Sequence, residues 1–532
     1  MDTDVLIIGA GPVGLTLALD LGRRSIRCTL IEQKNAPHMW PKMERCNARS
    51  MELYRRLGLA EKIRGAGLPS WVPMDVYIVT SLIEPPLLHL PYPSVADAKK
   101  EIAASHDGTL PLEPYQLISQ YTLEPLLKSV VETLPSVTVR YGCEFVSFKQ
   151  DANSVTAEVA EGGNTSLITA KYMVGCDGGA SNVRKQLDIK LAGEGNILQL
   201  RQALYRCDDL FERIAIGKGR HYHVADNQST QLIVQDSTKH FTLHSVVATD
   251  QDMATKFEAT VAMPVKYEML YVGEWRQNLL LAESYGHGRV LLAGDAVHLV
   301  IPTGGLGMNT GVGDAIDLGW KLAGTLQGWG GPGLLASYET ERRRVGENNV
   351  GASRYASLGR RKWRAQWKPE MRDSTPAGAA ARAHLAAVAD VEQRKTNEMI
   401  GAELGYHYFG SPLVATENGD GPPYDYVEYT PSTWPGVRLP HAWLPDGRAA
   451  ADCIGDGYTL IRLGGSKADG SALKTAFGKF GAPFTVLDLP GDEARTIYGR
   501  DLVLVRPDLH VVWRGNSPPD DPVRLAAAAT GH

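Results

Sequence analysis

Runs of apolar, mostly β-branched residues recur in the first 300 positions, and three of them end at a turn that contains glycine. Residues 5–8, 172–175 and 290–293 each predict a buried strand, and helical patterns follow the first and third of them, at 15–24 and from 307 onward. The second run leads into an acidic, glycine-rich turn and a helix start. We therefore expect parallel strands whose carboxyl ends meet at one ligand-binding edge of an α/β sheet.

Alternation of apolar and polar residues predicts further strands. Residues 71–90 predict short strands that leave the first unit and return to it. Residues 137–146, 154–160 and 166–171 predict a meander packed over the main sheet. From 191 to 275 the alternation predicts a separate, largely antiparallel sheet.

The last third of the chain changes character. Residues 346–402 are rich in Ala, Arg and Lys and predict helices, and the proline-rich stretch 422–445 predicts a linker. Strands are expected at 458–463, 484–487 and 502–505. The predicted units are a nucleotide-binding domain (1–75, 105–188 and 277–350), a substrate domain (76–104 and 189–276), a helical segment (351–412), a linker (413–445) and a C-terminal domain (446–532).

Composition narrows the class of protein. A chain of 532 residues exceeds one ordinary core, and 43% hydrophobic with 22% charged residues is typical of a globular enzyme. The net charge of −5 and the lack of an aromatic-and-basic motif argue against a nucleic-acid partner. No leader and no apolar run of about 18 residues is found, so no membrane span is expected. Six scattered cysteines without C-x-x-C pairs argue against a metal site or disulfides and favour a cytoplasmic location.

The first turn carries a dinucleotide-binding pattern. Gly9 permits a tight turn, Gly11 lets a pyrophosphate approach the backbone, and Gly14 allows the helix to pack closely on the strand. The phosphates would lie at the positive end of the helix dipole. A second strand, 27–32, ends at Glu32, where a carboxylate accepts hydrogen bonds from the ribose of an adenosine. The pattern alone fits either FAD or NAD(P), and glycine-rich turns also occur for packing reasons.

Two later turns bring acids and bare backbone to the same edge. The strand that ends at Asp177 places a carboxylate there, although an Asx turn explains this residue equally well. The third strand ends at Gly294 and Asp295. Glycines at 304, 305 and 307 then leave the start of the next predicted helix without side chains. N–H groups at such an entrance can contact a flat anionic group.

Charged and aromatic residues between the motifs are weaker candidates. Arg45 or Arg49 could pair with a diphosphate through a planar fork, although a solvated helix face explains them as well. Gln120, in the first turn of a predicted helix, could reach a cofactor or only solvent. The cluster 221–223 lies inside the second sheet, where packing is the commoner role and a pocket lining is the alternative.

Together these motifs resemble the single-component flavoprotein aromatic hydroxylases of the phenol and para-hydroxybenzoate hydroxylase type. The resemblance is carried by the turns at 9–14 with Glu32, at 176–184 and at 294–309, and it covers about the first 350 residues. It implies a Rossmann-type FAD-binding domain with an interleaved substrate sheet. It also implies bound FAD and a transient NAD(P)H co-substrate. After the segment 435–441, the C-terminal pattern resembles the thioredoxin-like domain of the phenol-hydroxylase branch.

The resemblance also assigns roles. Glu32 would hold the ribose, Arg45 and Gln120 would contact the diphosphate region, and Asp295 the ribityl or diphosphate portion. Asp177 would support flavin and nicotinamide binding, the helix entrance would face the pyrimidine edge of the flavin, and Pro302 would line the oxygen and substrate cavity. The full set of expected cofactor-binding residues is Gly9, Gly11, Pro12, Val13, Gly14, Glu32, Gln33, Arg45, Gln120, Asp177, Gly294, Asp295, Gly305, Gly307, Met308 and Asn309.

This sequence departs from the family pattern at several places. Ile301 stands where a second proline is common, and Asp317 stands where Asn is usual. The C-terminal domain has no C-x-x-C, since Cys453 stands alone, so a structural or dimer-forming role is expected for it. The signature tyrosines of the hydroxybenzoate enzymes cannot be placed, so that substrate is not inherited.

The expected reaction is hydroxylation of a small phenolic or other electron-rich aromatic compound. NAD(P)H would reduce FAD, O₂ would add to the reduced ring, and the terminal oxygen of a flavin hydroperoxide would pass to the phenol. A base that draws the phenolic proton would speed this transfer, and the candidates are Glu44, Tyr222 and His223. The alternatives are Baeyer–Villiger insertion or epoxidation on a polycyclic metabolite, and a flavin dehydrogenase or flavin-binding protein that never activates oxygen.

Overall fold

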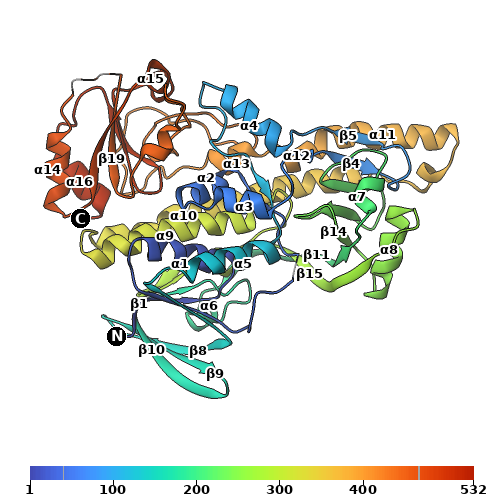
Figure 1. Ribbon diagram of the computed structural model, residues 1–532, viewed down its shortest axis with the longest axis horizontal. Helices are drawn as coiled ribbons and strands as arrows, with labels where there is room; N and C mark the ends of the chain where they lie inside the picture. Colours follow the sequence, from blue (N-terminus) through green and yellow to red (C-terminus); the bar gives the residue numbers. More distant parts are fainter. Residues whose placement is uncertain (40, 465, 467) are drawn as a thin grey trace.

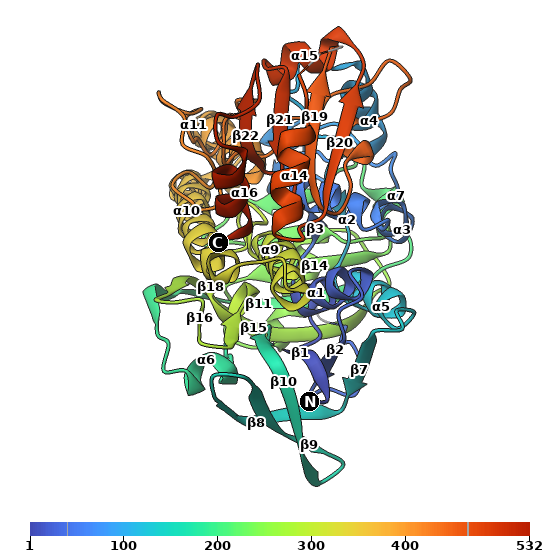
Figure 2. The same cartoon turned by 90° about the vertical axis from the view of Figure 1, so that its left-hand side faces the viewer.

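The computed structural model describes residues 1–39, 41–464, 466 and 468–532. Two long helices, α9 (Gly307–Gln327) and α10 (Pro332–Arg364), cross the middle of the molecule. The sheet that contains the N-terminal strand lies on one side of them and the C-terminal domain on the other (Figures 1 and 2). A second large sheet packs against helix α10.

The first sheet has eight strands, and its central part is parallel. Strands pair in the order β16-β17-β10-β1-β2-β7, with β8 and β9 joined to the outer part of β10. Strand β1 is almost completely buried because helices α1, α5 and α9 cover the sheet. The elements are β1 (Thr3–Ile8), α1 (Pro12–Arg23), β2 (Cys28–Glu32), α5 (Gln120–Val131), β7 (Val137–Tyr141), β8 (Cys143–Gln150), β9 (Val155–Glu161), β10 (Asn164–Gly175), α6 (Asn182–Gln186), β16 (Gly286–His287) and β17 (Val290–Leu292).

The predicted meander does not pack over this sheet but extends it. Residues 164–175 form the single strand β10, whose first half pairs with β9 and whose second half pairs with β1. The stretch 137–146, predicted as one strand, is divided between β7 and β8 at Gly142, which has φ +71°. A positive φ is readily adopted by glycine, and it lets the chain turn out of the parallel sheet here.

The second sheet also has eight strands, in the order β18-β15-β11-β14-β13-β12-β4-β5. As expected it is largely antiparallel. One pair is parallel, that of β12 with β4, and β4 lies in the stretch 71–90 that leaves the first unit early in the chain. The elements are β4 (Val76–Val79), β5 (Leu88–Leu90), α4 (Val95–Ala104), β11 (Leu191–Arg206), α7 (Leu210–Arg213), β12 (His221–Val224), β13 (Gln231–Val234), β14 (His240–Ser245), α8 (Gln251–Val261), β15 (Glu268–Ala282) and β18 (His298–Leu299).

The C-terminal domain is a four-stranded sheet in the order β20-β19-β21-β22. β19 runs parallel to β20 and antiparallel to β21, which is the arrangement of a thioredoxin-like domain. Its elements are β19 (Tyr458–Leu463), α14 (Ser471–Lys479), β20 (Phe484–Leu489), α15 (Asp492–Tyr498), β21 (Leu502–Val505), β22 (Val511–Gly515) and α16 (Pro522–Thr530). The connecting elements are β3 (Arg45–Cys46), α2 (Ala48–Arg56), α3 (Ala60–Ala66), β6 (Gln116–Leu117), α11 (Pro376–Glu392), α12 (Arg394–Asn397) and α13 (Ile400–Leu404).

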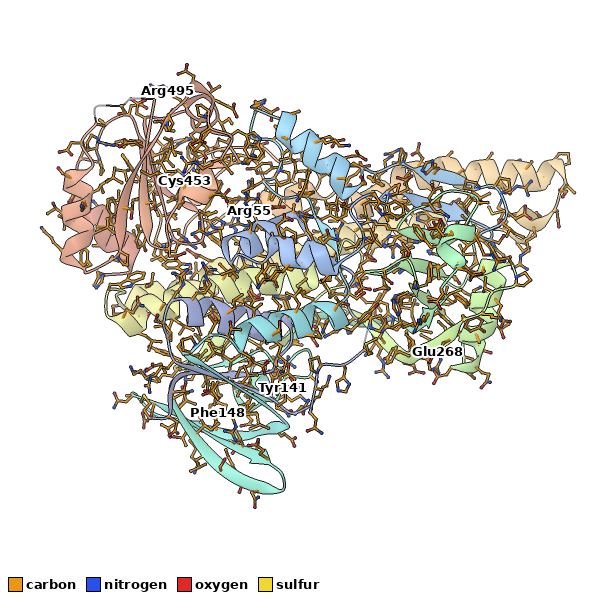
Figure 3. All side chains as sticks on the ribbon, in the orientation of Figure 1. Arg55, Tyr141, Phe148, Glu268, Cys453 and Arg495 are labelled. Atoms are coloured by element: carbon orange, nitrogen blue, oxygen red, sulfur yellow. The ribbon has the colours of Figure 1, made fainter. Side chains whose placement is uncertain are left out.

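Charged side chains fix the C-terminal domain to the rest of the molecule. Arg506 is fully buried and donates to both carboxylate oxygens of Glu341 on α10, at 2.7 and 2.6 Å. Arg55 of α2, labelled in Figure 3 beside the C-terminal domain, forms an ion pair with Asp452. Within the stretch predicted as a linker, Arg438 is buried and forms an ion pair with Glu52. These contacts hold the domain against α2, α9 and α10.

None of the helices in the described part of the chain combines the length and the apolar character that a membrane crossing needs.

Candidate active site

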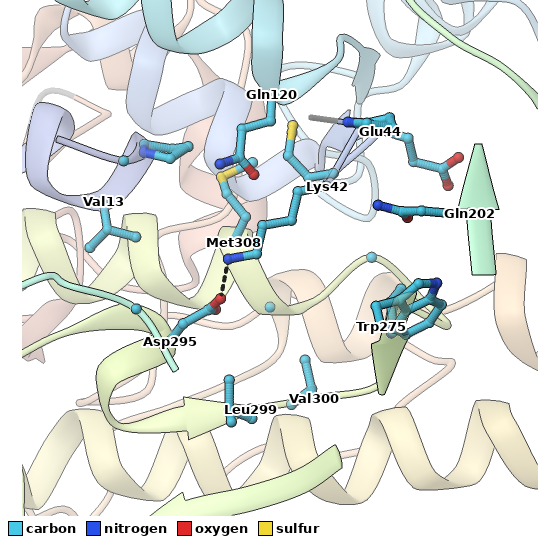
Figure 4. A pocket seen from close by; sticks show the side chains of 18 of the residues that line it. Val13, Lys42, Glu44, Gln120, Gln202, Trp275, Asp295, Leu299, Val300 and Met308 are labelled. Carbon is cyan, nitrogen blue, oxygen red and sulfur yellow. Dashed lines mark hydrogen bonds and ion pairs between the residues drawn. The ribbon is translucent and has the colours of Figure 1, made fainter. Parts of the chain in front are cut away.

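A cavity of about 840 Å³ extends from the first glycine-bearing turn to the second sheet. Gly11, Asp177 and Asp295 line one end, which is the carboxyl edge of the parallel strands. Gln202 and Trp275 of the second sheet line the other end (Figure 4). A volume of this size suits a cofactor or drug-sized ligand.

The glycines of the first turn test whether a dinucleotide fits. A Cβ on Gly9 would lie 2.5 Å from the carbonyl oxygen of Cys176, and one on Gly14 would lie 2.0 Å from the carbonyl oxygen of Gly9. Both positions therefore need glycine for packing. A Cβ on Gly11 would meet only Glu124 Oε1, at 4.0 Å, so packing does not require glycine here. Gly11 lines the cavity at the N-cap of α1, where the pattern predicts a pyrophosphate.

Two carboxylates lie beside this turn. Glu32 accepts hydrogen bonds from the backbone N–H groups of Ala10 and Lys34, both at 3.0 Å, which fixes its side chain at the end of β2. Asp177 accepts from the backbone N–H groups of Asn182 and Val183 through Oδ2. Its Oδ1 is buried without a hydrogen-bond partner among the described residues, and burial raises the pKa of this carboxyl. Asp177 thus caps α6 and also presents an unsatisfied oxygen beside the cavity.

An ion pair crosses this end of the cavity. Lys42 Nζ lies 2.9 Å from Asp295 Oδ2, and Figure 4 shows the two side chains reaching toward each other from opposite walls. Gln120, which also lines the cavity, donates to Glu124 at 2.6 Å. Lys42 was not singled out from the sequence, because a lone lysine in a charged loop carries no motif.

The entrance of α9 is held by Arg45 and Asn309. Arg45 Nη2 donates to the carbonyl oxygen of Gly304 and lies 3.3 Å from Glu403 Oε1. Asn309 Oδ1 accepts from the backbone N–H of Asn47. Arg45 lines the cavity, but the guanidinium contacts that the structure contains hold the glycine loop. Its expected contact with a diphosphate stays a prediction.

Arg49, the alternative to Arg45, points away from the cavity. Its Nη2 donates to the carbonyl oxygen of Asp508 at 2.9 Å, and its Nη1 lies 3.3 Å from Glu52 Oε2. Arg49 thus belongs to the contact with the C-terminal domain.

At the substrate end, Glu44 pairs with a histidine. Glu44 Oε2 lies 2.8 Å from His221 Nε2, and both residues line the cavity. Burial alone would raise the pKa of Glu44, but His221, Arg220 and Arg45 more than offset it and hold this pKa well below its usual range. Burial, with Arg220, lowers the pKa of His221 although Glu44 opposes the shift. Glu44 is therefore ionised and His221 neutral at pH 7.

The other two proton-transfer candidates lie behind the cavity wall. Tyr222 is fully buried and donates to the carbonyl oxygen of Gly217 at 2.8 Å. His223 is also fully buried, with its Nε2 3.2 Å from Gln393 Nε2. Neither is among the residues that line the cavity in the described part of the chain. In β12 successive side chains point to opposite faces, so His221 and Tyr222 cannot both reach the cavity; sequence alone did not tell which face is inside.

The remaining expected site residues divide in two groups. Gly14 and Gly294 do not line the cavity; a Cβ on Gly294 would lie 2.9 Å from Val13, so it is a packing position. The expected residues that do line the cavity, beyond those already described, are Gly9, Pro12, Val13, Gln33, Pro302, Gly305, Gly307 and Met308.

The two departures from the family pattern have structural settings. Ile301 is buried, and its carbonyl oxygen accepts from Ser353 Oγ at 2.6 Å. Asp317 lies 2.7 Å from Lys321 and 3.1 Å from Arg506 of the C-terminal domain, so this acid joins two parts of the molecule.

A parallel sheet with a glycine-bearing turn, a carboxylate at the end of its second strand and a bare helix entrance, closed by an antiparallel sheet, is typical of a flavin-dependent oxidoreductase. Family models agree with this assignment. Residues 2–353 match the model described as "FAD binding domain", and residues 432–531 match "Aromatic-ring hydroxylase, C-terminal". The chain belongs to this family of FAD-binding aromatic-ring hydroxylases, so the resemblance and the fold class stated from the sequence are confirmed.

Individual relatives agree. "FAD-dependent monooxygenase apdD" of Emericella nidulans is 33% identical over an alignment 566 residues long. The alignment covers 99% of this chain and 90% of that protein. "Chromopyrrolic acid-soaked RebC with bound 7-carboxy-K252c" superposes with a TM-score of 0.90 at 33% identity, covering 99% of both chains. The ternary complex of aklavinone-11 hydroxylase with FAD and aklavinone gives a TM-score of 0.83 at 27% identity, over 100% of this chain and 99% of the other. The chain is an FAD-dependent monooxygenase, with NAD(P)H as its co-substrate.

Proposed function

We propose that this enzyme hydroxylates an electron-rich, polycyclic aromatic compound with NAD(P)H and O₂. The observation that carries the proposal is the continuity of the cavity, which joins the cofactor end to a second end lined by Trp275 and Gln202. The RebC structure, soaked with chromopyrrolic acid and with 7-carboxy-K252c bound, and the aklavinone-11 hydroxylase complex with aklavinone support a substrate larger than one ring.

FAD, when bound, supplies a two-electron carrier that NAD(P)H reduces and that activates O₂. The residues that would hold it line the cavity: Gly11 at the start of α1, Glu32 at the end of β2, and Asp295 with Lys42. The N-terminus of α9 faces the same space and favours negative charge there. Pro302, beside this helix entrance, lines the space where substrate and oxygen would meet.

We assign the phenolic proton to the Glu44–His221 pair. A carboxylate only accepts hydrogen bonds, so His221 Nε2 donates to Glu44, and Nδ1 of the ring carries the lone pair. Nδ1 has no partner among the described residues. With its low pKa, Glu44 is a weak proton acceptor. It serves instead to orient the neutral imidazole and to stabilise the positive charge that the ring gains.

The reaction is tested with purified holoenzyme, a panel of phenolic polycycles, NADPH or NADH, and ¹⁸O₂. We expect substrate to stimulate oxidation of the reduced nicotinamide and the product to carry one ¹⁸O atom as a new hydroxyl. A product ester or epoxide would instead establish the Baeyer–Villiger or epoxidase alternative. Reduction of the flavin by the substrate itself, without nicotinamide, would establish a dehydrogenase and refute the proposal.

The proton assignment is tested with Glu44→Gln and His221→Gln. Loss of a general base typically costs 10²–10⁴-fold in rate, so we expect roughly a hundredfold slower hydroxylation. Flavin reduction by NADPH in single turnover should be unchanged, and the consumed O₂ should appear as hydrogen peroxide. Hydroxylation at the normal rate in both variants would refute the assignment.

Two further expectations belong to this proposal. A homodimer and a monomer both fit the sequence, and light scattering of the purified protein distinguishes them. A reducing cytoplasm is supported by the six cysteines, all of which are free thiols, and is tested by locating a tagged chain in its native cell.

A further inference from the structure

The substrate end of the cavity carries an excess of buried positive charge. Arg220, which precedes β12, and Arg360 and Arg364, one turn apart on α10, all line the cavity. Glu44 interacts electrostatically with Arg220 and Arg360, and Glu403, which pairs with Arg45, also interacts with Arg220. Cations at this depth are costly unless an anion or several acceptors compensate them.

Compensation is incomplete for Arg220 and Arg360. Arg220 is 3% exposed, and its Nε and Nη1 have no hydrogen-bond partner in the described residues. Arg360 donates through Nη1 to Gln231 at 2.9 Å, while its Nε is buried and has no hydrogen-bond partner in the part of the chain that the structure describes. Native structures leave few buried polar groups unsatisfied, so this concentration of them needs an explanation.

Arg364 has more hydrogen-bond partners, but most of these partners are neutral carbonyl oxygens. It donates to the carbonyl oxygens of Val224 and Thr230, and lies 3.7 Å from Asp226. Asp226 is itself paired with Lys256 at 2.7 Å.

The cluster therefore has a net positive charge. Together with the neighbouring Arg45–Glu403 pair it contains five cations, Arg45, Arg220, Arg360, Arg364 and Lys256, and three carboxylates, Glu44, Asp226 and Glu403, so two positive charges are uncompensated. The pKa values agree: burial lowers the pKa of Arg360 to about 10 and that of Arg364 to about 9, and neighbouring arginines add to both shifts.

We propose that Arg220 and Arg360 form an anion subsite that binds a carboxylate on the aromatic substrate. The subsite rests on the proposed function, because it occupies the substrate end of the same cavity. Guanidinium groups suit this task, since their planar N–H groups match the two oxygens of a carboxylate. Binding there would orient the ring system between the second sheet and the cofactor end.

The phosphate groups of the co-substrate NAD(P)H are a second kind of anion that could occupy such a subsite. The subsite lies beside Glu44 and His221, at the start of β12 and on α10, where the phenol is proposed to lose its proton, so a carboxylate on the same ring system would be within its reach. The substrate carboxylate is therefore the occupant that the position favours.

The test measures binding separately from turnover. Oxidised holoenzyme is titrated with 3-hydroxy-2-naphthoate, 3-hydroxy-2-naphthamide and 2-naphthol, and binding is followed by the flavin absorbance. We expect the acid to bind at least about tenfold more tightly than the amide or the naphthol, as a charge-assisted contact implies. In Arg360→Gln the affinity for the acid should fall about tenfold, and the affinity for the amide should stay the same.

Arg354→Gln is the matched control, because Arg354 lies on the same helix but outside the cavity, where it pairs with Glu194. This variant should bind all three compounds like the parent enzyme. Thermal melts of both variants exclude a general loss of folding.

Three outcomes would overturn the subsite. They are equal affinity for acid and amide, failure of the acid to bind at millimolar concentration, and a tenfold rise in KM for NADPH in Arg360→Gln without loss of acid binding. If the acid binds through Arg360 but is not hydroxylated, the subsite stands and the proposed reaction fails for that ring.

Discussion

Substitution of Gly11 by alanine should separate cofactor binding from folding. The backbone there has φ −71° and ψ 178°, which alanine adopts without strain. The added methyl would have only Glu124 Oε1 within 4.0 Å. Replacing glycine by alanine stabilises by about 0.4–1 kcal/mol through the unfolded state, and alanine is a poorer N-cap than glycine. We expect these terms to offset, so the free energy of unfolding of the FAD-free protein should change by less than about 1 kcal/mol.

The same methyl should weaken FAD binding. It would occupy the space through which a pyrophosphate approaches the backbone N–H groups of α1. Inserting a methyl into a close-packed contact costs about 1–3 kcal/mol. At about 1.4 kcal/mol for each factor of ten, the Kd of FAD should rise about 5- to 150-fold.

The assay is a titration of flavin-stripped protein with FAD, followed by fluorescence quenching, alongside denaturant unfolding of the stripped protein. Gly14→Ala is the contrasting variant, because its methyl would lie 2.0 Å from the carbonyl oxygen of Gly9 and would force α1 away from β1. We expect that variant to fold poorly with or without FAD. Unchanged FAD affinity in Gly11→Ala would refute the reasoning, as would equal destabilisation of both stripped variants.

Three further predictions concern the ion pairs. Arg506→Met should lower the free energy of unfolding by about 3–5 kcal/mol in chemical denaturation, because it leaves the Glu341 carboxylate buried and without its main cation. Asp317→Asn should gain stability relative to the parent as the pH rises from 5 to 8. Burial raises the pKa of Asp317 to about 7, so its favourable contribution is complete below about pH 4 and is lost as the pH rises through 7. A parallel pH dependence of the two melting curves would contradict this. Lys42→Met should change unfolding by less than about 1 kcal/mol, since its pair with Asp295 is half exposed, but should weaken FAD binding several-fold in the same fluorescence titration.

The cofactor end of the site could be predicted from the sequence because its determinants are local. Gly9, Gly11 and Gly14 lie within one turn, and Glu32 ends the next strand, so spacing alone places them at one edge. The substrate end depends on contacts between distant segments. His221 meets Glu44 across 177 residues, and no periodicity links them.

The arginine subsite illustrates the same limit. Arg360 and Arg364 share a helix face through their spacing of four, but a basic helix face is usually solvated. Only the packing of α10 against the second sheet turns that face inward, beside Arg220. The paired strand β12 posed a related problem, since sequence could not tell whether His221 or Tyr222 points into the cavity.

The C-terminal domain contacts helix α9, and the N-terminus of this helix lines the cavity. This helix begins at Gly307, which lines the cavity, and further along its length carries Asp317 and Lys321 into the buried contact with Arg506. Three carboxylates of this contact, those of Asp317, Glu341 and Asp508, surround Arg506 and Lys321, so removing either cation leaves buried negative charge at the back of the helix. We therefore infer that the C-terminal domain, which has no C-x-x-C pair, holds in place the helix whose N-terminus lines the cavity. Arg506→Met should therefore weaken FAD binding as well as folding, even though Arg506 lies outside the cavity, and tight FAD binding in a folded Arg506→Met protein would contradict this role.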